Sequence, residues 1–462
     1  MKGMVIDMST YFKRFGMFTI VLLLLTSMLS MVLVGCQNNE KENSITSDTI
    51  SSQEQSTVSK VTSNEVVKSD MMYNVKDFGA KANGTDDSSA IQAAIDKCAS
   101  SGGGTVFFPT GTYSIKSTII KKAKVSLVGS GMYATYLKWE GEPNSAIIDT
   151  SNEALWGTSI ENMFFSTANV QKVTGILGGS TLKNYNSAIG TFKNLVFSGL
   201  YCGISGNAEP TGVGIFDCNF ENIFASACTY GLHLYGSGNT IVHPRIATCE
   251  VGLVLDYLNG ESFDGIHVIG GIFASNKTDI SVPAKNGTRP CNFVGTWFED
   301  ASEGILSIKN TDTRIMNMTF RDCMLNSKAD GKKYFMFDAS KALGVITLDS
   351  CTVVNNAGII EPENPASKLV VKNLQVYDSD RSYIINDSAH GKFSAKGDAS
   401  KKSFTINHNL GFVPSFANAT IASADLTDNS FFITADEKTL TVTFSEAPKQ
   451  NADVAFYWEV RK

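Results

Sequence analysis

From about residue 160 onward, short strand-like runs of alternating apolar and polar residues return along this 462-residue chain at a steady interval. Consecutive runs begin 23 to 32 residues apart, a spacing typical of solenoid proteins. The runs occupy residues 161–165, 193–197, 216–220, 242–246, 268–272, 294–298, 321–325, 349–353 and 372–376. Because so short a strand cannot bury a core of its own, each run must pack on the run of the next coil. The repetition therefore predicts a solenoid.

A second series of strand-like runs lies between the first and completes each coil, at residues 231–235, 252–256, 279–282 and 304–308. Glycine and asparagine punctuate the corners, as tight bends require. A β-sandwich is the competing all-β fold, but it should show hairpin turns such as Asn-Gly about every 8–12 residues. Few such turns occur in this region. We therefore expect an all-β chain that coils as a single-stranded parallel β-helix.

The alignment of the runs also predicts which side chains leave the core, because successive residues of a strand point to opposite sides. It places Gly270 and Ile272 inside. It predicts two outward columns, of which one contains Asp217, His243 and Asp322 and the other Asn219, Arg245 and Trp297.

Residues 1–35 have the pattern of a secretory signal peptide, in which a basic start precedes an apolar stretch over residues 18–34. The sequence Leu33-Val34-Gly35-Cys36 resembles the bacterial lipobox, and that resemblance implies cleavage before Cys36 and a lipid on its thiol. The alternative is a transmembrane anchor, since the stretch is about long enough to span a bilayer. Both interpretations place the rest of the chain outside the cytoplasm. The lipobox interpretation holds it to the extracellular face of a bacterial membrane.

Residues 36–70 carry no aromatic side chain and are rich in Ser, Thr, Gln and Asn. A segment of this composition buries too little apolar surface to offset its chain entropy, so we expect a flexible tether.

The net charge of the whole chain is -6, which argues against nucleic acid as a partner. No Cys-x-x-Cys pair occurs and histidines number five, so the sequence predicts neither a metal site nor a cofactor. The eight cysteines after Cys36 are expected to be buried thiols.

Three segments near the start of the solenoid carry the most specific signal: residues 73–95, 102–113 and 125–131. They resemble the beginning of the β-helix domain of the pectate-lyase superfamily, which includes rhamnogalacturonases, polygalacturonases, epimerases and phage tailspikes. The resemblance implies a right-handed β-helix, expected over residues 71–388, with one capping helix. The residues agree, because Asp86, Asp87 or Ser88 can begin a helix whose apolar face would contain Ile91, Ala94, Ile95 and Cys98.

Residues 389–462 change character and read as alternating strands at 403–407, 430–434, 439–444 and 454–459. They predict a small antiparallel β-sandwich, similar to terminal modules of secreted and phage β-helix proteins. Such modules bind glycan, form trimers or cap the helix. A homotrimer is therefore a possible assembly.

The catalytic strings of polygalacturonases, which include Gly-His-Gly and Arg-Ile-Lys, do not occur in the sequence. Glycoside hydrolysis needs two carboxyl groups about 5 Å apart for retention or 6.5–9.5 Å for inversion. Adjacent rungs stand ~4.8 Å apart, so carboxylates one or two rungs apart would meet this need. Our candidate catalytic residues are Glu299, Asp300 and Asp264. Candidate substrate-binding residues are Trp297 for stacking, Arg245 and Arg321 for a uronate carboxylate, and His243 and His267 as acid or base.

We therefore expect a cell-surface protein that processes a plant or microbial polysaccharide, as a glycoside hydrolase or a polysaccharide lyase. The alternatives are a non-catalytic glycan-binding or adhesion protein on the same solenoid, and a sugar epimerase. A catalyst should show two carboxylates converging in a groove with an aromatic floor. A binding protein should show aromatic residues without that pair.

Overall fold

The computed structural model describes residues 72–461, apart from 152–153, 169–170, 180–187, 207–213, 257–264, 284–289, 309–312, 330–332, 334–335, 355–358, 361–367, 379–380, 386–387, 409 and 411–412. The predicted signal peptide, Cys36 and the tether lie outside these residues. None of the helices in the described part is long and apolar enough to cross a membrane.

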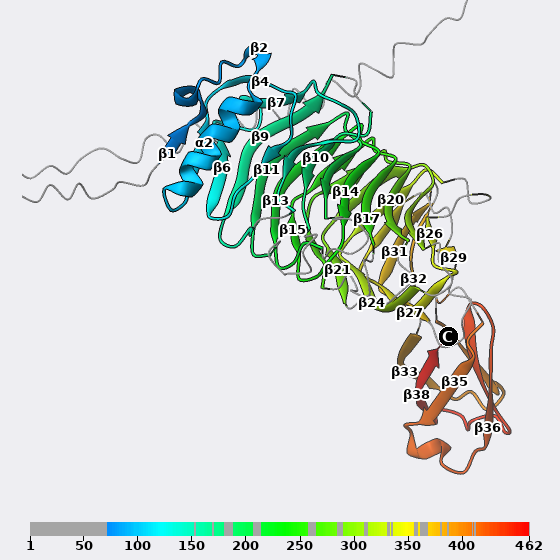
Figure 1. Ribbon diagram of the computed structural model, residues 1–462. Coiled ribbons are helices and arrows are strands. Elements are labelled where there is room, and N and C mark those ends of the chain that lie inside the picture. Colours follow the sequence, from blue (N-terminus) through cyan, green and yellow to red (C-terminus); the bar gives the residue numbers. More distant parts are fainter. Residues whose placement is uncertain are drawn as a thin grey trace, which may run out of the picture. The chain divides into compact units, whose positions relative to one another are not determined.

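Parallel strands coil into the expected β-solenoid, whose rungs follow one another along a single axis (Figure 1). Three strand faces run along it, and we call them A, B and C. Face A contains β1 (Met72–Asn74), β3 (Gly104–Phe108), β6 (Val125–Gly129), β15 (Thr240–Val242), β18 (His267–Ile269), β21 (Cys291–Val294), β24 (Thr313–Arg321), β27 (Ala342–Asp349) and β30 (Lys368–Lys372). The long strands β9 (Ser159–Thr167), β11 (Thr191–Ser198) and β13 (Asn219–Ser226) run from face A into face B.

Face B continues the same 22-stranded sheet. It contains β2 (Asn83–Asp86), β4 (Gly111–Ile115), β7 (Thr135–Trp139), β16 (Arg245–Ala247), β19 (Ile272–Ala274), β22 (Trp297–Ala301), β25 (Met324–Ser327), β28 (Thr352–Val354), β31 (Leu374–Asp378) and the antiparallel β32 (Arg381–Ile385). Face C is a separate sheet of ten strands. They are β5 (Ile119–Ile120), β8 (Ala146–Asp149), β10 (Thr174–Leu177), β12 (Cys202–Ser205), β14 (Tyr230–Leu234), β17 (Val251–Leu255), β20 (Thr278–Val282), β23 (Gly304–Ile308), β26 (Phe337–Asp338) and β29 (Ile359–Ile360).

The core lies inside the coil, where equivalent side chains of successive rungs stack. Phe192 stacks on Phe220 with ring centroids 4.9 Å apart, and Phe293 stacks on Phe320 at 4.8 Å. Such offset or face-on aromatic pairs add to the stability gained from apolar burial. The eight cysteines of the described residues are buried free thiols, in agreement with the sequence interpretation.

The corner between faces A and B is formed by a column of residues in the left-handed backbone conformation. Asn162, Asn194 and Asn222 have φ of 61°, 53° and 53°. Asn194 Nδ2 donates to Asn162 Oδ1, and Asn222 Nδ2 donates to Asn194 Oδ1, each at 2.8 Å. Asparagine tolerates this conformation better than most residues, which explains its use here. His243 continues the column in the next rung with φ of 49°.

The strand register confirms that Arg245 and Trp297 share an outward column, and it corrects the predicted places of Ile272, Asn219, Asp217 and Gly270. Arg245 pairs with Ile272 and Ile272 with Trp297, so Arg245 and Trp297 share an outward column as expected. Ile272 therefore faces outward, and the prediction that it lies inside is wrong; the neighbouring Phe273 is buried instead. Asn219 pairs with Thr240 on face A, away from Arg245.

Asp217 does not join the column of His243 either. It lies one corner earlier, before β13, where its backbone N–H donates to the carbonyl oxygen of Ser237. Gly270 occupies the A–B corner in the rung after His243, with φ of 64°, so it is a corner residue rather than a core residue.

The helix α2 (Ser88–Ser100) covers the N-terminal end of the solenoid, next to β3 and the short helix η1 (Val75–Phe78) (Figure 1). Its buried side chains include Ile91, Ala94, Ile95 and Cys98, as predicted. The acidic residues before it are structural. Asp86 Oδ1 accepts a hydrogen bond from the Ser88 backbone at 3.0 Å, and Asp87 Oδ1 accepts one from the Lys81 backbone at 2.6 Å.

The C-terminal residues form two antiparallel sheets with a hydrophobic core of their own, as predicted. One sheet has the order β33 (Ser388–Lys396), β38 (Asp453–Arg461), β35 (Phe416–Ile421). The other has the order β34 (Ser403–Asn407), β37 (Thr439–Phe444), β36 (Phe431–Ala435), and the short helix η2 spans Ala424–Leu426. Phe393 and Phe456 stack in this core with centroids 4.9 Å apart.

Candidate functional site on face A

Face B carries Trp297 and Arg245, two of the predicted substrate-binding residues. Trp297 is 45% exposed, and the Arg245 guanidinium lies 5.6 Å from the centroid of the Phe224 ring one rung earlier. A cation at this distance from an aromatic ring is attracted to its face. We call this outward column the face B ridge. It contains Phe224, Arg245, Ile272 and Trp297, none of which is a carboxylate.

The predicted carboxylates do not form a facing pair. Glu299 continues the column of Ala274 on face B, whereas Asp300 occupies the next corner with φ of 62°. Asp300 Oδ2 forms an ion pair with Lys328 Nζ at 2.6 Å. Asp264, the third predicted catalytic residue, lies outside the described residues. The described part of the chain thus gives no support for a carboxylate pair at this position.

A pocket of about 350 Å³ opens on face A, across β15, β18, β21 and β24. It lies between two outward columns. The pairing of these strands places Thr240, His267, Asn292 and Thr319 in the first column and Ile269, Val294 and Arg321 in the second. The apolar members of the second column and the polar groups at its rim give the mixture that small-molecule sites commonly have.

Of the described residues that line this pocket, His267 and Arg321 are the two with ionisable side chains. The amide of Asn292 lies 3.2 Å from His267 Nδ1. An amide supports either imidazole tautomer, since its NH₂ donates to a bare nitrogen and its oxygen accepts from a protonated one. Arg321 Nε lies 3.6 Å from Asp349 Oδ2 in the next rung, and the arginine side chain is 56% exposed. The guanidinium therefore remains accessible to a ligand.

The structure thus divides the predicted site between two faces. His267 and Arg321 lie on face A, whereas Arg245, Trp297 and Glu299 lie on face B. His243 stands at the corner between them, and a Cβ on Gly270 would lie 2.7 Å from its Cδ2. The strand pairing does not bring His267 together with Arg245 and Glu299, because they lie on opposite sides of this corner.

Sequence reasoning gave little weight to a cluster on face C. His233 Nε2 lies 3.3 Å from Asp256 Oδ2, and the Tyr235 hydroxyl donates to the same oxygen at 3.2 Å. Burial, and next the Asp256 carboxylate, raise the pKa of Tyr235 above its usual value. The alternation of residues 231–235 could have revealed that His233 and Tyr235 share a face. Nothing local in the sequence connects them to Asp256 of the next rung.

No group of three or more His, Cys, Asp or Glu side chains within the described ranges has an arrangement able to hold a metal ion. The face A pocket accordingly offers an imidazole, a guanidinium, amides and hydroxyls as its polar groups.

Residues 72–155 match the family model described as rhamnogalacturonase A/epimerase, pectate lyase-like. This part of the solenoid is therefore similar to that family. The match covers α2 and the first rungs. The face A pocket, built from residues 240–321, lies beyond it.

Two curated relatives share short segments with this chain. Alginate lyase 7 of Azotobacter vinelandii is 46% identical over 94 residues, which are 18% of this chain and 11% of that protein. Plasmin and fibronectin-binding protein A of Streptococcus pneumoniae is 43% identical over 72 residues, 14% of this chain and 10% of that protein. The chain therefore spans about a tenth of the length of these relatives.

Among solved structures, the A-module of mannuronan C-5 epimerase AlgE4 from Azotobacter vinelandii aligns with a TM-score of 0.47 and 17% identity. The alignment covers 66% of this chain and 95% of that module.

Proposed function

We propose that the chain acts on an acidic polysaccharide and that the face A pocket holds a uronate unit, which is then cleaved by β-elimination or epimerised. The observation that carries the proposal is that the Arg321 guanidinium and the His267 imidazole both line one pocket. Arginine recognises carboxylates through parallel N–H donors, and histidine transfers protons near neutral pH.

Both reactions begin by removing the proton on the carbon next to the uronate carboxylate. Arg321 would bind that carboxylate and stabilise the negative charge that develops on it. His267 would accept the proton, and Asn292 would hold the imidazole in the tautomer that each step needs. In elimination, a carbon–carbon double bond forms, the carbon–oxygen bond to the next sugar breaks, and the leaving oxygen takes up the proton that His267 had accepted. In epimerisation, a water molecule on the opposite side of the ring gives a proton to the same carbon, and the protonated His267 neutralises the hydroxide that this leaves.

Hydrolysis receives less support from this pocket. A glycosidase needs an acid and a nucleophile or base, which are normally two carboxyl groups. The residues that line the described pocket include neither Asp nor Glu. The names of the relatives, alginate lyase and mannuronan epimerase, point to uronate substrates as well.

The test is to incubate the purified full chain with sodium alginate and with polygalacturonate. Elimination produces an unsaturated sugar that absorbs ultraviolet light, and epimerisation changes the proton NMR spectrum of the polymer. We expect His267→Gln to lower turnover by about a hundredfold or more, the usual contribution of a general acid–base group. Arg321→Ala should lower kcat/KM by about tenfold to a hundredfold.

Arg245→Ala distinguishes the two faces, because Arg245 carries the same charge on face B. If Arg245→Ala lowers turnover and Arg321→Ala leaves it intact, the site lies on face B and the proposal for face A fails. Release of reducing ends without an unsaturated product would instead indicate hydrolysis.

An adhesin is the second candidate, favoured by the 43% identity to plasmin and fibronectin-binding protein A over 72 residues. The face B ridge with the exposed Trp297 would then be a binding surface. Retained glycan or protein binding, with no turnover of either polymer, would select this candidate.

A further inference from the structure

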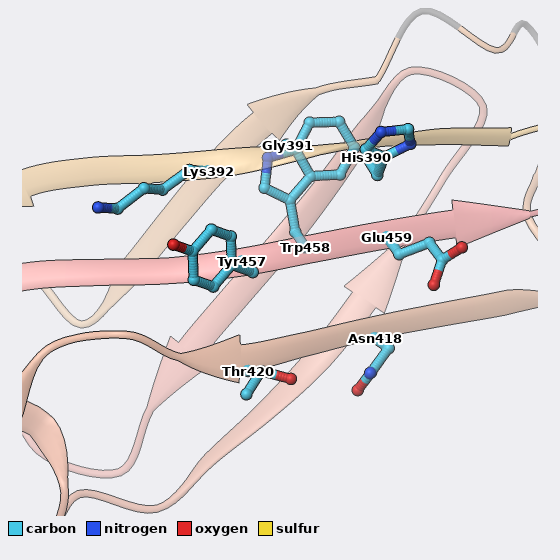
Figure 2. Close-up of a pocket in the computed structure, with 8 residues that line it drawn as sticks. All are labelled: His390, Gly391, Lys392, Asn418, Thr420, Tyr457, Trp458 and Glu459. Carbon is cyan, nitrogen blue, oxygen red and sulfur yellow. The ribbon is translucent and has the colours of Figure 1, made fainter.

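The sheet β33–β38–β35 has one face on the C-terminal core and one face in solvent. Strand pairing sets two rows of outward side chains across it. One row contains His390, Glu459 and Asn418, and the other contains Lys392, Tyr457 and Thr420. Figure 2 shows the rows on either side of Gly391 and Trp458.

A trough with a volume of about 620 Å³ lies between these rows. Gly391 has no side chain, and the Trp458 side chain points to the core side because alternate residues of a strand point to opposite faces. These two positions form the floor of the trough. A Cβ on Gly391 would lie 3.1 Å from the Trp458 ring, so the ring would have to shift by a few tenths of an ångström to admit one. The trough therefore crosses the three strands with side-chain walls and a largely backbone floor.

The walls combine an exposed aromatic ring with many hydrogen-bonding groups. Tyr457 is 56% exposed, and the Lys392 ammonium lies 5.7 Å from the centroid of its ring. Asn418 and Thr420 are exposed beside them and add amide and hydroxyl donors and acceptors. A sugar has an apolar ring face and a polar rim of hydroxyls, so it can use both kinds of wall at once.

The charge of the trough selects among sugars. Glu459 is engaged by Arg461, whose Nε lies 2.6 Å from Glu459 Oε1 and lowers the pKa of that carboxyl. Within the described residues, no carboxylate lies at ion-pair distance from Lys392 Nζ. Lys392 is therefore the cation that remains available, and a carboxylate on the ligand would complement it.

We propose that this trough binds a segment of a uronate-containing polysaccharide as a non-catalytic site. Binding in this trough does not depend on turnover in the face A pocket. The proposed activity and the proposed binding site can therefore be disproved independently of each other. A second copy of the chain is the alternative occupant, and the test below distinguishes it.

The experiment measures binding of the full chain to sodium alginate by affinity electrophoresis and titration calorimetry. It uses the Arg321→Ala background, in which both turnover and the proposed uronate contact on face A are weakened. Tyr457→Ala should weaken binding by about tenfold, the cost of losing an aromatic contact at the centre of an interface. Lys392→Gln should weaken it and reduce its dependence on salt. Thermal unfolding of each variant checks that the sheets remain folded.

Phe432→Ala is the matched control, since Phe432 is 60% exposed on the other C-terminal sheet and does not line the trough. It should bind alginate as the parent chain does. Equal binding by the parent, Tyr457→Ala and Lys392→Gln would overturn the proposal. A second result would also overturn it: the parent chain sediments as an oligomer, and Tyr457→Ala dissociates that oligomer without changing alginate binding. The trough would then be a contact between copies of the chain.

Discussion

Asp279 is an acidic residue inside the solenoid, on strand β20. Its side chain is fully buried, Oδ1 accepts a hydrogen bond from Asn276 Nδ2 at 2.8 Å, and Oδ2 has no hydrogen-bond partner among the described residues. Burial raises the pKa of Asp279 to about 8. At neutral pH the folded protein therefore holds this carboxyl in its neutral form, since a buried unpaired charge is costly.

This residue predicts a pH dependence of stability. The folded pKa of about 8 lies above the ordinary value of 3.8, so the folded state binds one proton more than the unfolded state between these values. Stability should then fall as pH rises across that window, by up to ~1.4 kcal/mol per unit. Asp279→Asn, which resembles the neutral acid, should remove this loss. Urea denaturation at several pH values between 5 and 8 measures the effect.

The exposed Asp96 of α2 provides the comparison. Asp96→Asn should leave the slope of stability against pH unchanged. A parent protein whose denaturation midpoint is the same at pH 5 and pH 8 would show that Asp279 is not neutral in the folded state.

At the scale of elements, the asparagine column of the A–B corner combines two requirements. Each position needs a left-handed backbone and a side chain that bonds to the rung above and below, and Asn194 meets both. Most other residues pay about 1–2 kcal/mol for this backbone conformation.

Two substitutions at Asn194 separate these contributions. Asn194→Gly should lose only the two amide bonds, about 1–3 kcal/mol in total. Asn194→Ala should lose a further ~1–2 kcal/mol, because alanine disfavours the left-handed conformation. The free energies of unfolding of the two variants, compared under the same conditions, test this order. Equal losses would mean that the backbone at this corner relaxes.

The repeat pattern predicted most of the rung register. The runs that begin at Glu161, Lys193 and Val242 lie in one column, and those that begin at Val294 and Arg321 continue it. The run predicted at 268–272 begins one residue too early, since Ile269 rather than Val268 pairs with Val242. Gly270 and Gly271 have no side chains, so the apolar and polar alternation does not show which face they belong to. The run at 216–220 has the same alternation of apolar and polar residues as the segment five residues later, which is the one that pairs with the run at 193–197. The alternation alone therefore could not decide between the two segments.

The candidate site was harder to predict for a related reason. The sequence interpretation treated each run as one straight strand, so His267, Arg245 and Glu299 seemed to share a face. The bend depends on single left-handed residues such as His243, whose backbone conformation does not follow from alternation. The Arg321 and His267 candidates nevertheless fall in one pocket, because both precede the corner in their rungs.

At the scale of the whole molecule, we propose that a lipid on Cys36 holds the solenoid at a bacterial surface. In bacterial cells that express the chain and grow with radiolabelled palmitate, the chain should carry label, and Cys36→Ser should lose it. Cys98→Ser, which changes a buried thiol of α2, should keep the label. A parent chain that fractionates with membranes but carries no lipid label would favour the transmembrane alternative.

The pairing of the rungs has a mechanical consequence. Their backbone hydrogen bonds join each strand to its neighbours in the adjacent rungs, and so they run along the direction in which the coils succeed one another. A force that pulls the first and last coils apart would load these bonds in a peeling geometry, so that few of them resist at any moment. Extension in a single-molecule force experiment should therefore release the solenoid in small successive steps, each about one coil long.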